Sequence, residues 1–140
     1  VENSGTKLQV NCNTDAAFLG KGKLEFKDFG KKYIGYPVFD LGNLYENLIA
    51  SSEIDRREIY KTSGFTFETA ERFWKKVINL YFEGEKTELI ERAKDRARLM
   101  AYFNIFYRLI ARGKTDSKEF PYYKEKFIEH INRCGSLDFE

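Results

Sequence analysis

Asp28 is the residue whose type and position most clearly suggest chemistry. It follows a short alternating segment, residues 23–27, that we predict to be a β-strand, and Gly30 comes shortly after it. A carboxylate held at a strand end by a tight glycine turn is well placed to bind a hard cation such as Mg²⁺, which prefers oxygen ligands. An aspartate that only begins a turn would have the same neighbours, so both interpretations stay open.

Five lysines lie close together around this strand and are interleaved with Phe26, Phe29 and Tyr33. They are Lys21, Lys23, Lys27, Lys31 and Lys32. Such a pattern can bind phosphate or nucleic acid, but lysines on a sheet edge also prevent the addition of another strand, and we favour that role. The net charge of +2 gives no general attraction to nucleic acid or to an anionic membrane, so neither is an expected partner.

The elements that position Asp28 are predicted to be a small β structure. Residues 7–11 and 23–27 alternate in hydrophobicity and are expected to pair as a β-hairpin or small sheet. Residues 28–37 contain two glycines and a proline, which predicts a loop. Residues 1–37 are therefore expected to form a β-hairpin and a loop.

From Val38 onward the hydrophobic period becomes helical. The pattern predicts helices over residues 38–50, 53–61, 67–83, 87–112 and 121–133, with Thr66 as an N-cap and Gly84, Gly113 and Gly135 as stops. We therefore predict a mainly α fold with a small β element followed by four to five packed helices. Residues 1–140 are expected to form one domain, of which residues 38–140 are helical.

The second half of the longest predicted helix, residues 99–111, is apolar almost all round. A helix that is apolar on every side is normally buried on every side. We expect the helices at 38–50, 67–83 and 121–133 to cover it, with Ala97 and Ala101 allowing close approach.

The cysteine and histidine content limits the chemistry further. Cys12 and Cys134 are too few for a disulfide framework, which favours a reducing compartment, and His130 alone cannot form a typical zinc site with them. We expect His130 to favour the helix C-terminus or to be exposed. No apolar run is long enough for a membrane span and no signal-peptide pattern opens the chain, so a cytoplasmic location is expected. Val1 in place of Met is consistent with processing or with a longer parent protein.

Several residues between 23 and 51 carry a family resemblance. They are Asp28, Gly30, Gly35-Tyr36-Pro37 and Phe39-Asp40-Leu41. This order resembles the C-terminal lobe of aminoglycoside-phosphotransferase-like kinases, in the protein-kinase-like superfamily. The resemblance implies that Asp28 binds Mg²⁺ and that Asp40 steadies the loop, although a first-turn helix charge explains Asp40 equally well. It also implies Mg²⁺ and ATP as cofactors and transfer of the γ-phosphoryl group to a hydroxyl of a small-molecule substrate.

The catalytic loop of that family is not intact in this chain. In an alignment without gaps its catalytic Asp, second His and metal-binding Asn correspond to Cys12, Thr14 and Ala17. In a shifted alignment Asp15 could replace the catalytic base and Asn13 the metal ligand, but neither restores the motif. Residues 1–22 are also too few to form the family's nucleotide-covering N-terminal lobe.

The sequence therefore supports three interpretations. The leading one is a C-lobe fragment or degenerate relative of an ATP-dependent small-molecule phosphotransferase, inactive alone, with a missing N-terminal lobe or a protein partner. The alternative is a non-catalytic helical protein-interaction module, in which the Asp-Phe-Gly triplet at Asp28 is accidental. The third is a nucleic-acid-binding domain that uses the lysine-rich hairpin.

Overall fold

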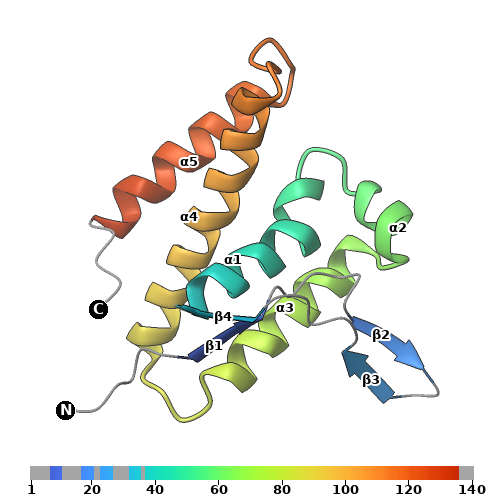
Figure 1. The fold of residues 1–140 in the computed structure, drawn as a ribbon, viewed down its shortest axis with the longest axis vertical. Coiled ribbons are helices and arrows are strands. Elements are labelled where there is room, and N and C mark those ends of the chain that lie inside the picture. Colours follow the sequence, from blue (N-terminus) through green and yellow to red (C-terminus); the bar gives the residue numbers. More distant parts are fainter. Residues whose placement is uncertain (1–6, 11–16, 21–22, 27–31, 36, 136–140) are drawn as a thin grey trace.

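A computed structural model of the chain describes residues 7–10, 17–20, 23–26, 32–35 and 37–135. The strands are β1 (Lys7–Val10), β2 (Ala17–Gly20), β3 (Lys23–Phe26) and β4 (Lys32–Gly35). The helices are α1 (Pro37–Leu48), the short 3₁₀ helix η2 (Ala50–Ser52), α2 (Glu58–Ser63), α3 (Phe67–Tyr81), α4 (Thr87–Ala111) and α5 (Phe120–Cys134). Most described residues are helical (Figure 1), which confirms the prediction of a mainly α protein.

The strands form two separate antiparallel pairs, β1 with β4 and β2 with β3. Leu8 lies opposite Ile34 in the first pair, and Ala17 lies opposite Phe26 in the second. The expected pairing of residues 7–11 with 23–27 is therefore wrong. The prediction of a loop over residues 28–37 is also wrong in part, because β4 lies within it. Alternation along one segment does not identify its partner, and here β1 pairs with a strand that is distant in sequence.

Four of the five predicted helices begin and end close to the positions that the sequence predicts. The prediction over residues 53–61 is wrong in part, because residues 53–57 are not helical and α2 spans only Glu58–Ser63. The backbone N–H of Thr69 donates to Oγ1 of Thr66 at 3.2 Å, which is the N-cap interaction expected at the start of α3. Gly84, Gly113 and Gly135 follow α3, α4 and α5 with positive φ angles of 84°, 65° and 65°. An L-residue with a side chain rarely adopts such a φ, so these glycines favour the ends of the three helices.

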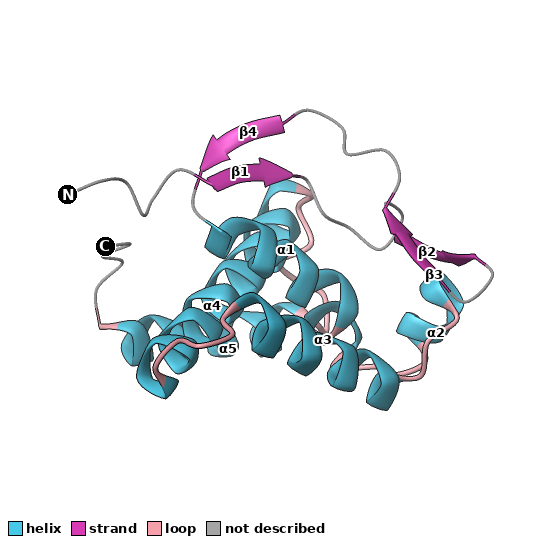
Figure 2. Ribbon diagram, turned by 90° about the horizontal axis from the view of Figure 1, so that it is seen from below, coloured by secondary structure: helices cyan, strands magenta, loops and turns pink. Residues whose placement is uncertain are grey.

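The centre of the fold is the contact of α4 with α1 and α5, the two helices against which it mainly packs. Ala97 and Ala101 of α4 are completely buried, which confirms that they allow close approach. On α1 the facing residue is Gly42, where an added Cβ would lie 2.7 Å from the Cβ of Met100. The β1–β4 pair lies over α1, on the side of that helix opposite α5 (Figure 2).

One face of α4 is exposed, contrary to the expectation that residues 99–111 are covered all round. The exposed fractions of Phe103, Tyr107 and Ile110 are 41%, 61% and 46%. Among the described elements only α1 and α5 lie along α4, because α3 packs mainly beside α1 and reaches α4 over a short stretch. Although α4 spans 25 residues, none of the described helices has the length and apolar composition needed to cross a membrane.

Candidate functional site

The three residues predicted to act in catalysis or metal binding, Asn13, Asp15 and Asp28, lie outside the described residues. The described strand ends nevertheless define how their segments are connected. The β1–β4 pair ends with Val10 opposite Lys32, and the β2–β3 pair ends with Ala17 opposite Phe26. Residues 11–16 connect β1 to β2, and residues 27–31 connect β3 to β4. Both segments therefore link the Val10–Lys32 end of one strand pair to the Ala17–Phe26 end of the other.

Asp40, the second acidic residue of the family resemblance, lies in the first turn of α1. Its side chain is partly buried, and its Oδ1 atom is shielded from solvent. The next residue, Leu41, is buried in the core, so the start of α1 is anchored on its inner side. The position of Asp40 is compatible with a structural role and with a favourable charge at a helix N-terminus.

A carboxylate that accepts hydrogen bonds from three tyrosines lies between the helices, and it was not predicted from the sequence. Oε1 of Glu53 accepts hydrogen bonds from the hydroxyls of Tyr102 at 2.8 Å and Tyr45 at 3.4 Å. Its Oε2 accepts one from Tyr122 at 3.0 Å. The three tyrosines come from α4, α1 and α5, so a single glutamate joins three helices.

The tyrosines of this Glu53 cluster are held in their neutral form. Burial raises the pKa of Tyr102, and the neighbouring Tyr45 and Glu53 raise it further. The pKa of Tyr122 is also raised, first by its partial burial and then by the charge of Glu53. Neutral phenols donate hydrogen bonds to a carboxylate and do not repel it. The geometry and the raised pKa values therefore fit a fixed polar joint between helices rather than a centre of proton transfer.

His130 lies beside this cluster and not on the surface. Its side chain is 4% exposed, and its ring centroid is 4.9 Å from that of Tyr102. Its Nδ1 atom is 2.9 Å from the main-chain oxygen of Lys126, one turn earlier in α5. Exposure, one of the two expectations for His130, is wrong, because the packing of α5 on α4 covers it.

A pocket of about 340 Å³ lies where the C-terminal end of α4 meets η2, α2 and the start of α5. Ile105 and Leu109 of α4 and Tyr123 of α5 form an apolar floor, and the buried hydroxyl of Tyr123 donates to the main-chain oxygen of Ala50 at 2.6 Å. In Figure 1 the C-terminal end of α4 and the start of α5 lie at the top, remote from the β1–β4 pair, while α2 lies on the right, above the β2–β3 pair.

The α4 side of this pocket is basic. Arg108, Arg112 and Lys114 line it, and the two arginines lie one helical turn apart. The NH1 atom of Arg108 lies 2.6 Å from Oε1 of Glu46, a buried residue of α1. Within residues 37–135, Arg112 and Lys114 form no ion pair, so their charges are available to a ligand.

The acidic residues of the pocket are mostly neutralised by their own neighbours. The guanidinium of Arg57 donates to both carboxylate oxygens of Asp55 at 3.0 Å, and this interaction lowers the pKa of Asp55 to about 2. The ammonium of Lys61 pairs with Glu58 at 2.5 Å. Glu119 is the one acidic lining residue with no ion pair among the described residues.

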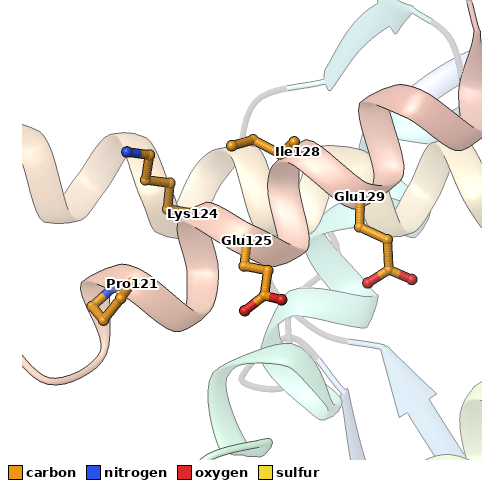
Figure 3. Close-up of a pocket in the computed structure, with 5 residues that line it drawn as sticks. All are labelled: Pro121, Lys124, Glu125, Ile128 and Glu129. Carbon is orange, nitrogen blue, oxygen red and sulfur yellow. The ribbon is translucent and has the colours of Figure 1, made fainter.

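A second hollow, of about 370 Å³, lies on the outer face of α5. Its described lining comes from that helix alone (Figure 3). Lys124 and Ile128 point to one side in the figure, while Glu125 and Glu129 point to the other. Because its charged groups diverge, this hollow offers less to a polar ligand than the pocket at the end of α4.

No group of three or more His, Cys, Asp or Glu side chains that could hold a metal ion occurs within the described residues. The predicted ligands Asp28 and Asn13 lie outside them. Sequence reasoning missed both the Glu53 cluster and the pocket, because each gathers residues from segments far apart in the chain. The one local signal was the Tyr122-Tyr123 pair, in which the fully buried member is Tyr123.

Comparison with models of protein families gave no match, and comparisons with curated proteins and with solved structures gave no significant similarity.

Proposed function

We propose that this chain is the C-terminal lobe, or a degenerate relative, of an ATP-dependent small-molecule phosphotransferase of the aminoglycoside-phosphotransferase type, inactive alone and acting in the cytoplasm. The observation that carries the proposal is the order of residues from Asp28 to Phe39-Asp40-Leu41. The described elements support it, because β3 ends just before Asp28 and α1 begins at Pro37, directly ahead of the Phe-Asp-Leu triplet.

The connectivity of the strands gives further support. Residues 11–16 and 27–31 both connect the Val10–Lys32 end of one strand pair to the Ala17–Phe26 end of the other. Two chain segments that start at the same end of one strand pair and finish at the same end of another can bring their side chains near one another. Asp28 would bind Mg²⁺, with Asn13 as a second ligand and Asp15 as a remnant of the catalytic base, and the metal would neutralise the phosphates of ATP.

Two experiments test this proposal. Addition of Mn²⁺ in place of Mg²⁺ is expected to broaden the amide resonances next to Asp28 and within residues 11–16. Asp28→Asn should abolish this effect, while Asp116→Asn, a change at an exposed loop aspartate, should leave it intact. Broadening that is the same in both variants would contradict a metal role for Asp28.

The isolated chain should also show no turnover of radiolabelled ATP, because the catalytic-loop pattern is not intact. Turnover that survives repurification would contradict this expectation.

A non-catalytic interaction module is the alternative, and the exposed face of α4 favours it. Phe103, Tyr107 and Ile110 follow one another at helical spacing and are each more than one third exposed. A contiguous exposed apolar stripe is typical of a surface that another protein covers. If this alternative is correct, Phe103→Ser and Tyr107→Ser should abolish association with a partner and change the free energy of unfolding by less than about 1 kcal/mol.

A further inference from the structure

We propose that the pocket at the C-terminal end of α4 binds a small organic anion with an apolar body, either a carboxylate or a phosphate monoester. The proposal does not depend on the kinase-like ancestry, because the described residues that line this pocket lie within 51–58 and 105–123, whereas the kinase-like residues lie within 28–41.

The size and floor of the pocket indicate the body of the ligand. Its volume of about 340 Å³ is at the lower end of the range of roughly 300–1,000 Å³ that is typical of small-molecule sites. Ile105, Leu109 and Tyr123 provide an apolar floor, and Ile54, which is 49% exposed, forms part of the wall. A ring or short alkyl chain would cover these side chains.

The balance of charges indicates the head group. Asp55 and Glu58 are each paired with a cation outside the pocket lining, and Arg108 is paired with Glu46. Among the described residues, this leaves Arg112 and Lys114 against a single unpaired carboxylate, that of Glu119. The surplus is positive, so an anionic group is complementary to this side of the pocket.

One cation of the pocket is already ordered. Glu46 is 6% exposed and holds NH1 of Arg108 at 2.6 Å, which fixes the guanidinium at the pocket wall. A guanidinium has five N–H donors, so one contact to Glu46 leaves others for a ligand. Because Arg108 is ordered before binding, less side-chain entropy is lost when an anion docks.

The test is a titration of the ¹⁵N-labelled chain with four probes: 3-phenylpropanoate, phenyl phosphate, inorganic phosphate and the neutral 3-phenylpropanamide. We expect the two aromatic anions to shift amide resonances of residues 51–58 and 109–123, with a dissociation constant of about 1 mM or below. The neutral amide and inorganic phosphate should each bind at least about fivefold more weakly, because one lacks the charge and the other lacks the apolar body. The relative affinity of the two anions distinguishes a carboxylate site from a phosphate site.

The variants separate specific binding from general attraction. The double variant Arg112→Gln, Lys114→Gln should weaken binding of both anions about tenfold. The matched control Lys75→Gln, Lys76→Gln removes the same charge from the exposed face of α3 and should leave the affinity unchanged. Ile54→Ser tests the apolar contact at an exposed position and should weaken binding about threefold. Absence of clustered shifts at about 10 mM anion, affinity for the neutral amide equal to that for the acids, or equal effects of the two double variants would each overturn the proposal.

Discussion

The hydroxyl of Tyr102 in α4 donates a hydrogen bond of 2.8 Å to Oε1 of Glu53, a residue 49 positions earlier in the chain that follows η2. Tyr122 of α5 binds the other oxygen of the same carboxylate at 3.0 Å. Glu53 thereby connects two helices that also pack on each other through apolar side chains. A partly buried carboxylate with several donors stabilises the fold only if those donors remain in place.

Removal of the Glu53 carboxylate should therefore destabilise the helical core. We expect Glu53→Ala to lower the free energy of unfolding by about 2–4 kcal/mol, because it leaves buried phenol hydroxyls without an acceptor, and Glu53→Gln to lower it by about 1–2 kcal/mol. Urea denaturation measures both, with the exposed Glu85→Ala as the control. A loss below about 0.5 kcal/mol for Glu53→Ala would show that the cluster contributes little to stability.

Stability should decrease at alkaline pH because of the same tyrosines. Their pKa values are raised in the folded protein, chiefly by burial, so the folded state keeps its phenolic protons at a pH where the unfolded chain releases them. Their contribution is fully present below a pH of about 10, and above it falls by up to about 1.4 kcal/mol per pH unit for each tyrosine. Unfolding measured across this range should show a shallower decline for Tyr122→Phe, with the exposed Tyr60→Phe as the control. Equal declines of stability with pH in the unsubstituted chain, Tyr122→Phe and Tyr60→Phe would contradict a raised pKa of Tyr122 in the folded protein.

Gly42→Ala tests the close crossing of α1 and α4. Alanine favours a helix over glycine by about 1 kcal/mol, but here its Cβ would lie 2.7 Å from the Cβ of Met100 and 3.2 Å from the main-chain oxygen of Ala97. Overpacking of this kind costs about 1–3 kcal/mol, so we expect net destabilisation. Thermal unfolding measures this loss. The control is Asn47→Ala, at an exposed position of the same helix, which should leave the unfolding temperature nearly unchanged. A gain in stability for Gly42→Ala would mean that the helices separate easily.

Phe106 and Tyr107 are adjacent in α4 but face different surroundings. The ring of Phe106 lies between Phe120 and Phe127 of α5, with centroid distances of 5.3 and 5.5 Å, while Tyr107 is 61% exposed. Truncation of a buried aromatic residue costs about 3–5 kcal/mol, and because Phe106 is only partly buried we expect Phe106→Ala to cost about 2–3 kcal/mol. Tyr107→Ala should cost less than about 1 kcal/mol. Chemical denaturation of both variants checks this, and similar losses for the two would contradict the orientation of α4.

Much of the helical part of this protein was determined by the sequence alone. The apolar period placed the helices, Thr66 marked the start of α3, and Gly84, Gly113 and Gly135 marked the ends of three helices. These signals are local, because a cap or a left-handed glycine acts within one turn of the residue that provides it. The close approach at Ala97 was also predicted, since a small residue in an apolar stripe is readable from its spacing.

The tertiary structure decided which segments meet. Strand partners, the covered faces of α4, the Glu53 cluster and the pocket beside Arg112 all depend on contacts between distant residues. The apolar composition of residues 99–111 suggested burial on every side, but it could not show that two helices rather than three would lie along them. Glu53 illustrates the physical reason: its sequence neighbours resemble those of a surface glutamate, and only the packing of α1, α4 and α5 brings three tyrosine hydroxyls to its carboxylate.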